Sequence, residues 1–286
     1  MTAPIERTFA VPGLALAARE WGKPGGLPVI ALHGWLDNAG TFDLLAPLLE
    51  KAHIVALDSA GHGLSGHRSA DATYNIWQDV PEVFAVADQL GWQRFALLGH
   101  SRGAAIACLA AGTFPERVSA LALLDGGVPI PAEPAEVPTR FAESITARER
   151  QRLIHGRIFA NRNDAIAERS RGFTKTTMGA AEILAQRSLH PVEGGFSWFV
   201  DQRLKTESEL RLSHEQISAF MTTISAPTLA ILATDSPLSR RDWFQSLLRQ
   251  IRQLEVIEVT GGHHCHLEGR EQGIAAHVTP FLIANA

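Results

Sequence analysis

The pentapeptide Gly99-His100-Ser101-Arg102-Gly103 constrains the fold of this chain more than any other segment. An apolar run at 94–98 precedes it and a stretch of small residues at 104–111 follows it, so a strand leads into it and a helix leaves it. In this context Gly-x-Ser-x-Gly is typical of a nucleophile elbow, a sharp turn that holds a serine hydroxyl clear of the sheet. Glycines on either side keep Cβ atoms out of the crowded backbone. Ser101 is therefore the predicted nucleophile, and the alternative is a serine that only caps a helix.

Length and composition are typical of a globular protein with a sizeable core. The chain has 286 residues, of which 45% are hydrophobic and 20% charged, and α/β domains of this size often form one body. A net charge of −4 gives no basic surface for nucleic acid. We expect a cytoplasmic protein, because the first residues lack a signal-peptide core and no stretch reaches the roughly 20 apolar residues of a membrane span. Cys108 and Cys265 form no disulfide framework and are expected to be reduced thiols.

Strand and helix patterns alternate along most of the chain. Several of the expected strands are continuous apolar runs, as in parallel strands that are covered on both faces. This alternation predicts an α/β fold with a mostly parallel, doubly wound sheet. The expected strands are 14–21, 28–32, 53–58, 94–98, 118–124, 227–233 and 254–259, and the expected helices are 42–50, 76–90, 104–112, 243–252 and 268–283.

The alternation is interrupted between residues 127 and 223. Prolines open a polar region with patchy helical stretches and no strand of comparable strength. We expect a helical lid over the strand ends, where the sites of open α/β sheets form, on a core of residues 1–126 and 224–286. The alternative is a separate helical domain that binds a partner. Helical stretches are expected at 141–155, 164–171, 180–189 and 198–209.

A serine hydroxyl is a weak nucleophile at neutral pH, so Ser101 needs a base and the base needs an acid that orients it. The glycine-rich segment 261–268 carries a late cluster of histidines. His263 directly follows its glycine pair and is the predicted base, with His264 as the alternative. Consecutive residues point in different directions and rarely share one ion, so no metal site is expected here. The four side chains considered as metal ligands are His263, His264, Cys265 and His266.

Taken together, these features resemble the α/β-hydrolase superfamily, and the segment from His33 to Phe42 resembles its serine hydrolase-like family. The resemblance covers nearly the whole chain. It implies an α/β-hydrolase fold without a cofactor, with the nucleophile, the acid and the histidine in that order and the lid inserted after the sixth core strand, here 118–124. Further agreement comes from the segments 58–65, 123–127 and 201–204 and from the Gly-Gly-His-His-x-His run at 261–266.

Two backbone N–H groups are expected to stabilise the negative oxygen of a tetrahedral intermediate. In the superfamily scheme one follows the nucleophile and the other lies in the loop after the strand at 28–32, and these residues are Arg102 and Trp35. The Arg102 side chain is expected to be solvated or ion-paired, and the alternative is contact with a substrate carboxylate. Local hydrogen bonds that brace the loop are expected from His33, Asp37 and Asn38.

Two aspartates stand where members of the superfamily carry the acid. Asp125 ends the strand at 118–124, and Asp235 follows the strand at 227–233. The commoner arrangement has a Gly-x-x-Asp turn after the second of these strands. Here Ala233 takes the place of that glycine and Ser236 that of the acid, so the segment departs from the pattern. We favour Asp125 as the acid and keep Asp235 as the alternative.

The resemblance and these residues predict a serine hydrolase of the carboxylesterase type that cleaves a small or medium ester through an acyl-enzyme. The same triad also suits a thioester, an amide or a carbon–carbon bond, and a non-catalytic ligand-binding homologue is a further alternative. Epoxide or haloalkane opening is not expected, because it needs a carboxylate where this chain has Ser101. We expect a small-molecule substrate and no cofactor, and nothing in the sequence sets the oligomeric state.

Overall fold

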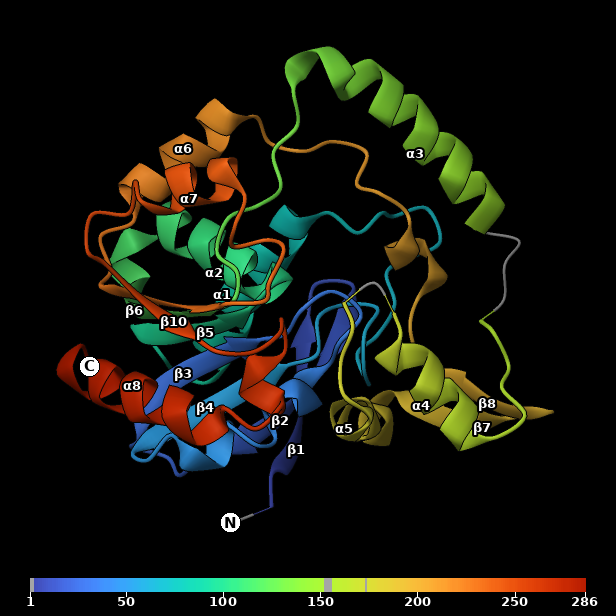
Figure 1. The fold of residues 1–286 in the computed structure, drawn as a ribbon, viewed down its shortest axis with the longest axis horizontal. Coiled ribbons are helices and arrows are strands. Elements are labelled where there is room, and N and C mark those ends of the chain that lie inside the picture. Colours follow the sequence, from blue (N-terminus) through green and yellow to red (C-terminus); the bar gives the residue numbers. More distant parts are fainter. Residues whose placement is uncertain (1–2, 152–155, 173) are drawn as a thin grey trace.

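The computed structural model describes residues 3–151, 156–172 and 174–286, and an eight-stranded sheet forms its centre (Figure 1). The strand order is β1-β2-β4-β3-β5-β6-β9-β10, in which β1 and β2 are antiparallel to their neighbours and the others pair in parallel. The predicted mostly parallel α/β sheet is confirmed. The strands are β1 (Ile5–Val11), β2 (Leu14–Trp21), β3 (Leu27–Leu32), β4 (Ala52–Leu57), β5 (Phe95–His100), β6 (Val118–Leu124), β9 (Thr228–Ala233) and β10 (Leu254–Val259).

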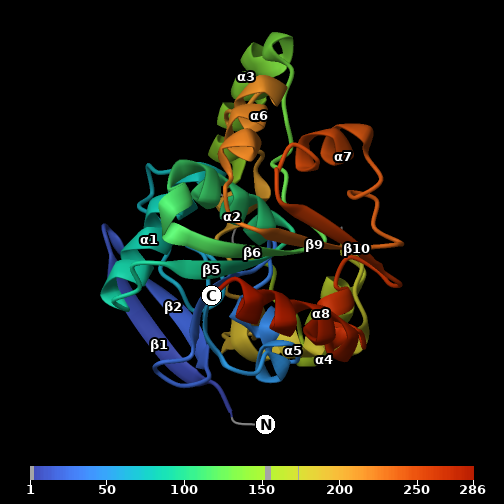
Figure 2. The same cartoon turned by 90° about the vertical axis from the view of Figure 1, so that its left-hand side faces the viewer.

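Helices cover both faces of this sheet, as Figures 1 and 2 show. Side chains alternate across a strand, so Phe95 and Leu97 of β5 enter one apolar core while Ala96 and Leu98 enter the other. No helix in the described part of the chain is long and apolar enough to cross a membrane. One face is covered by α1 (Asp79–Gln89), α2 (Arg102–Thr113), α6 (His214–Thr223) and α7 (Asp242–Leu248), and the other by α8 (Glu271–Ala284) and the 3-10 turns η1 (Ala39–Phe42) and η2 (Ala46–Leu48). Shorter 3-10 turns are η3 (Ile76–Gln78), η4 (Pro115–Arg117), η5 (Pro134–Glu136) and η7 (Cys265–Leu267).

Between β6 and β9 the chain leaves the sheet and forms an insertion (Figure 1). It contacts loops that follow the carboxyl ends of the core strands: the indole Nε1–H of Trp35, after β3, donates to the carbonyl oxygen of Leu204 at 2.8 Å. The last helix of this segment, α6, packs against the core helices α2 and α7, and buries Ile217 and Met221 there. The other elements are α3 (Val137–Gln151), α4 (Arg162–Ser170), α5 (Met178–Ser188), the hairpin β7 (Leu189–Val192) and β8 (Gly195–Trp198), and the turn η6 (Gln202–Lys205).

Two of the helix predictions are wrong. Instead of one helix, residues 42–50 contain the end of η1 and the short turn η2, because Pro47 lacks the N–H that a longer helix needs. Residues 198–209 begin as a strand, since Trp198 pairs with Leu189 across the hairpin, and only η6 follows. The end of the helix expected at 141–155 lies partly outside the described residues.

The edge strand β1 was not expected. Most of its residues are exposed and two of them, Glu6 and Arg7, are charged. An edge strand of this kind carries no continuous apolar run, which is why its pattern gave no strand signal.

A buried ion pair joins the insertion to the core. Arg187 of α5 is fully buried, and its Nε lies 3.0 and 2.8 Å from the two carboxylate oxygens of Asp58, which follows β4. The Asp58 carboxylate also accepts the backbone N–H groups of Ala39 and Leu64, both at 2.7 Å. Nη1 of Arg187 reaches both oxygens of Glu6, at 2.7 and 2.6 Å. Removing the guanidinium would leave the Asp58 charge buried without its partner.

We expect Arg187→Met to lower the free energy of unfolding by about 3 to 5 kcal/mol, because an uncompensated charge remains in the interior. Urea denaturation measures this loss. Arg162→Met is the matched control: Arg162 pairs with Glu182 within the insertion, both side chains are more than a third exposed, and such a pair contributes less than about 1 kcal/mol. Equal losses in the two variants would contradict the prediction.

Candidate active site

Ser101 sits in the sharp turn between β5 and α2, with a strained backbone (φ 52°, ψ −115°). The neighbouring backbone leaves no room for side chains on either side of it. A Cβ on Gly99 would lie 2.4 Å from the Cα of Ala104, and one on Gly103 would lie 2.0 Å from the carbonyl oxygen of Leu32. Strain of this kind persists where surrounding packing imposes it. The turn therefore has the geometry of a nucleophile elbow.

Ser101, His263 and Asp125 lie together although they are far apart in the sequence. Nε2 of His263 is 2.9 Å from Oγ of Ser101, and Nδ1 of the same ring is 2.5 Å from Oδ2 of Asp125. A carboxylate oxygen only accepts, so Nδ1 carries the proton and Nε2 is left to accept the serine hydroxyl proton. This tautomer suits a general base.

Asp125 is fixed from two directions at the end of β6. Its Oδ1 accepts the N–H of Ala233 at 3.0 Å, its own N–H donates to Ile231 at 2.8 Å, and its side chain is buried. The alternative acid, Asp235, is exposed, and its carboxylate accepts from the Thr234 hydroxyl at 3.3 Å. The structure thus brings Asp125, and not Asp235, to His263.

The loop after β3 holds the Trp35 amide in a defined direction. The carbonyl oxygen of Gly34 accepts from Nδ1 of His33 at 2.7 Å and from the N–H of Asp37 at 3.2 Å. In a planar trans peptide the N–H points opposite to the carbonyl, so the Trp35 N–H points away from these two donors. Nε2 of His33 accepts the N–H of Ser59 at 3.0 Å, and burial lowers the pKa of His33, which keeps the ring neutral in this role.

Arg102, whose amide is the other one expected from the sequence, is the first residue of α2, where helix N–H groups have no partner within the helix. Its side chain turns away to an ion pair: Nη2 lies 2.6 Å from Oδ2 of Asp79, and both side chains are largely buried. No sequence pattern indicates that Asp79 is its partner. The guanidinium is therefore ion-paired, as expected.

The other histidines of the 261–268 segment do not face Ser101. Nε2 of His264 lies 3.1 Å from Oδ2 of Asp37, and Nε2 of His266 lies 2.8 Å from Oγ1 of Thr41. Both rings are buried, and burial together with the neighbouring imidazoles holds the pKa of His266 well below its usual value. The predicted base His263, rather than the alternative His264, is thus the ring beside the nucleophile.

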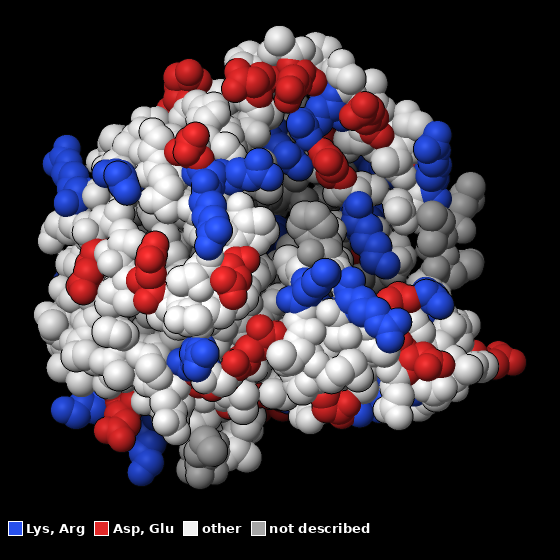
Figure 3. Space-filling view, in the orientation of Figure 1, with Lys and Arg blue, Asp and Glu red and all other residues white. Residues whose placement is uncertain are grey.

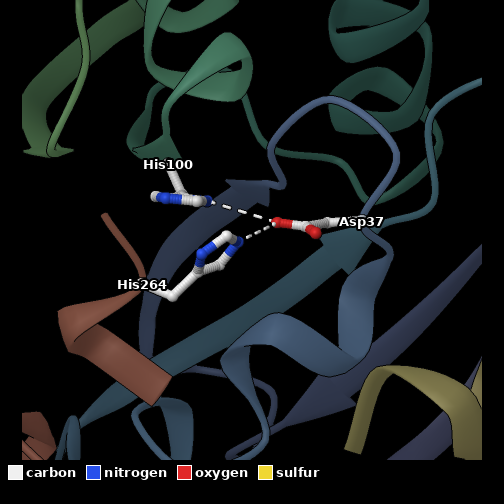
Figure 4. A group of neighbouring side chains, drawn as sticks. All are labelled: Asp37, His100 and His264. Carbon is white, nitrogen blue, oxygen red and sulfur yellow. Dashed lines mark hydrogen bonds and ion pairs between the residues drawn. The ribbon is translucent and has the colours of Figure 1, made fainter. Parts of the chain in front are cut away.

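Asp37, His100 and His264 form a buried group whose possible metal-binding atoms lie within 4.8 Å of one another (Figure 4). The Asp37 carboxylate already accepts from Nη2 of Arg169 at 2.5 Å. Although burial alone would raise it, the pKa of Asp37 is held well below its usual value by the charges of His264 and Arg169 and by hydrogen bonds. A divalent ion would add two further positive charges to a carboxylate that is already paired. We therefore assign no metal to this group.

A cavity of about 500 Å³ lies between the loop at 67–70 and the β8–η6 segment. Ser101 is not among the described residues that line it. The lining includes Trp198 and Phe199, together with polar side chains of the loop and of η6. Figure 3 shows a hollow on the face between α3 and α4, with Lys and Arg mixed with Asp and Glu around it. On the face seen in this view, charges of both signs are interspersed.

Comparison with known proteins gives the family of the chain. The family described as "alpha/beta hydrolase fold" matches residues 28–270. A serine hydrolase-like protein of Danio rerio is 30% identical over 292 residues, covering 97% of this chain and 88% of the relative. Serine hydrolase-like protein 2 of Homo sapiens is 31% identical over 303 residues, covering 97% and 93%.

Solved structures give the same fold over the whole chain. The crystal structure of a hypothetical protein from Pseudomonas aeruginosa PAO1 has a TM-score of 0.93 and 41% identity, covering 97% of this chain and 99% of that one. The thioesterase domain from the curacin biosynthetic pathway has a TM-score of 0.84 at 22% identity, over 99% and 100% of the two chains, and shows likeness of fold alone. The chain belongs to the α/β-hydrolase superfamily and, within it, to the serine hydrolase-like family.

Proposed function

We propose that this hydrolase is a carboxylesterase-like enzyme that cleaves a small or medium ester with Ser101, His263 and Asp125 as its triad. The observation that supports the proposal most is that the ring of His263 contacts both partners. Its Nε2 lies 2.9 Å from Oγ of Ser101, and its Nδ1 lies 2.5 Å from Oδ2 of Asp125. A nucleophile, a base within hydrogen-bond reach and a group that orients the base are the parts that acyl transfer requires.

In the proposed reaction, Nε2 of His263 takes the proton of Ser101 while Oγ attacks the ester carbonyl carbon. The amides of Trp35 and Arg102 stabilise the oxygen that becomes negative. His263 then gives its proton to the leaving alcohol, and the acyl group stays on Ser101. Water, deprotonated by the same ring, attacks the acyl-enzyme and releases the acid. Asp125 remains ionised and stabilises the imidazolium.

The charges around Ser101 favour a substrate that is uncharged near the ester bond. The nearest arginine along the chain, Arg102, is neutralised by Asp79 at 2.6 Å and is not available to a substrate carboxylate. We also propose that residues 127–223 form a cap on a core of residues 1–126 and 224–286, with α6 of this segment packed on the core.

A fluorophosphonate probe tests the nucleophile. We expect covalent labelling of the wild-type protein with release of fluoride, and no labelling of Ser101→Ala, because only an activated serine oxygen displaces fluoride from phosphorus. Mass spectrometry of the labelled peptide gives the site. A folded wild-type protein that takes no label would favour a binding protein over an enzyme.

Two matched substitutions test the acid. Asp125→Asn should lower kcat for an activated ester by about three to four orders of magnitude, because the orienting charge is lost and the imidazole tautomer changes. Asp235→Asn should leave kcat unchanged, since that carboxylate is exposed and bonded to its neighbour Thr234. Steady-state kinetics on both variants decides the assignment, and equal activity of the two would contradict it.

A series of p-nitrophenyl esters with increasing acyl length tests substrate size. We expect kcat/KM to rise over short acyl chains and fall over long ones, because extra methylenes gain free energy only while the pocket can bury them. Thioesters and amides of the preferred acyl group serve as comparisons. Each catalysed rate is divided by the uncatalysed rate of the same substrate. If this ratio is larger for the thioester than for the ester, the chain is assigned to the thioester alternative.

A further inference from the structure

Three segments that would carry out the proposed reaction, two loops and the end of β5, meet at one buried polar group (Figure 4). Asp37 comes from the loop that holds Trp35, His100 directly precedes Ser101, and His264 directly follows His263. Oδ2 of Asp37 lies 3.1 Å from Nε2 of His264 and 3.5 Å from Nδ1 of His100. All three side chains are at most 1% exposed.

His100 extends this group to the proposed base. Its Nε2–H donates to the backbone carbonyl oxygen of His263 at 2.9 Å, and the two rings lie 4.7 Å apart between centroids. Asp37 therefore bonds to the loop of the base through His264, whose Nε2–H donates to its carboxylate. The single proton of a neutral His100 lies on Nε2, so its Nδ1 has no hydrogen to donate to Asp37. A shift of its carboxylate would move the backbone on both sides of the proposed active site.

The insertion supplies the charge that balances Asp37. Nη2 of Arg169, in the last turn of α4, lies 2.5 Å from Oδ1 of Asp37, and the guanidinium is largely buried. Burial lowers the pKa of His100 to about 4, so at neutral pH that ring is uncharged and adds no positive charge. Asp37 keeps one local hydrogen bond, from its N–H to Gly34, as expected, but its carboxylate has partners more than 130 residues away in sequence.

We propose that Asp37 and Arg169 are positioning residues of the enzyme: Arg169 holds the Asp37 carboxylate, which in turn holds the loops of Trp35 and His263 in register with Ser101. The inference rests on the proposed function. Neither side chain touches the reacting atoms in this scheme. Their effect reaches the reacting atoms through the hydrogen bond of Asp37 to His264 and through the electric field at the base.

The two charges act on His263 in opposite directions. Without Arg169 the unbalanced carboxylate would stabilise the protonated imidazole, whereas without Asp37 the remaining guanidinium would destabilise it. The charged and titratable groups around Asp37 are Arg169, His33, His62, His100, His264 and His266, and those around His263 are Asp125, His100, His264 and His266. Simple loss of structure would not produce shifts of opposite sign.

The experiment compares Arg169→Met with Asp37→Asn in the pH dependence of kcat/KM on an activated ester. We expect the acid limb of the profile to move to higher pH in Arg169→Met and to lower pH in Asp37→Asn, each by at least about half a unit. Plateau values should fall about tenfold or more in both, mainly through kcat. Arg169→Lys keeps the charge and should restore most of the activity.

Arg162→Met is the matched control, because Arg162 lies on the same helix and pairs with Glu182 at the surface. It should leave both the profile and the plateau unchanged. Shifts that are absent, or of the same sign in Arg169→Met and Asp37→Asn, would overturn the inference, as would an equal effect of Arg162→Met.

Labelling by the fluorophosphonate probe separates this outcome from failure of the proposed function. If the wild-type protein is not labelled, the enzyme assignment fails and the positioning role fails with it. If the wild-type protein is labelled and Arg169→Met is labelled at the same rate over the whole pH range, only the positioning role fails. Circular dichroism checks that each variant is folded. If Arg169→Met is not folded, Arg169→Lys and Asp37→Asn test the inference.

Discussion

The tight backbone packing around Ser101 is the constraint on which the site depends. The turn at Ser101 packs against the ends of the strands on either side of β5. A Cβ on Gly103 would lie 2.0 Å from the carbonyl oxygen of Leu32, and one on Gly126 would lie 2.6 Å from the carbonyl oxygen of Ser101. Leu32 ends β3 and Gly126 directly follows Asp125. The same contacts that impose the strained turn therefore place the loop of Trp35, the proposed oxyanion loop, on one side of Ser101 and Asp125, the proposed acid, on the other. The relative placement of these groups comes from close-packed backbone, which deforms little.

A second constraint is the burial of carboxylates where the core strands end. Burying an ionised carboxylate costs several kcal/mol unless a charged partner and hydrogen bonds offset it. Asp37 and Asp58 both lie in loops after core strands and both are buried. Their partners, Arg169 and Arg187, come from the insertion. The insertion is thus attached to the core where it neutralises charge, which ties its position to the loops that carry the proposed chemistry.

Sequence patterns predict the parts of this site that depend on local geometry. The elbow and the late histidine are each recognisable within a few residues, because a sharp turn and a glycine-rich loop need particular residues at fixed spacing. The pairs Asp37–Arg169 and Asp58–Arg187 join residues 132 and 129 positions apart. Nothing in hydrophobic periodicity predicts which distant arginine meets which aspartate, so only the folded chain reveals them.

The contacts of the insertion also differ in strength along its length. Helix α5 is held by the fully buried Arg187, whereas α3 is held by ion pairs of Arg140 with Glu207 and of Arg148 with Glu209, at side chains that keep part of their exposure. A partly exposed pair contributes at most about 1 kcal/mol, and a buried one cannot be broken without leaving a charge uncompensated. Displacing α3 therefore costs much less free energy than displacing α5. A movement confined to α3 would leave in place the arginines that contact Asp37 and Asp58.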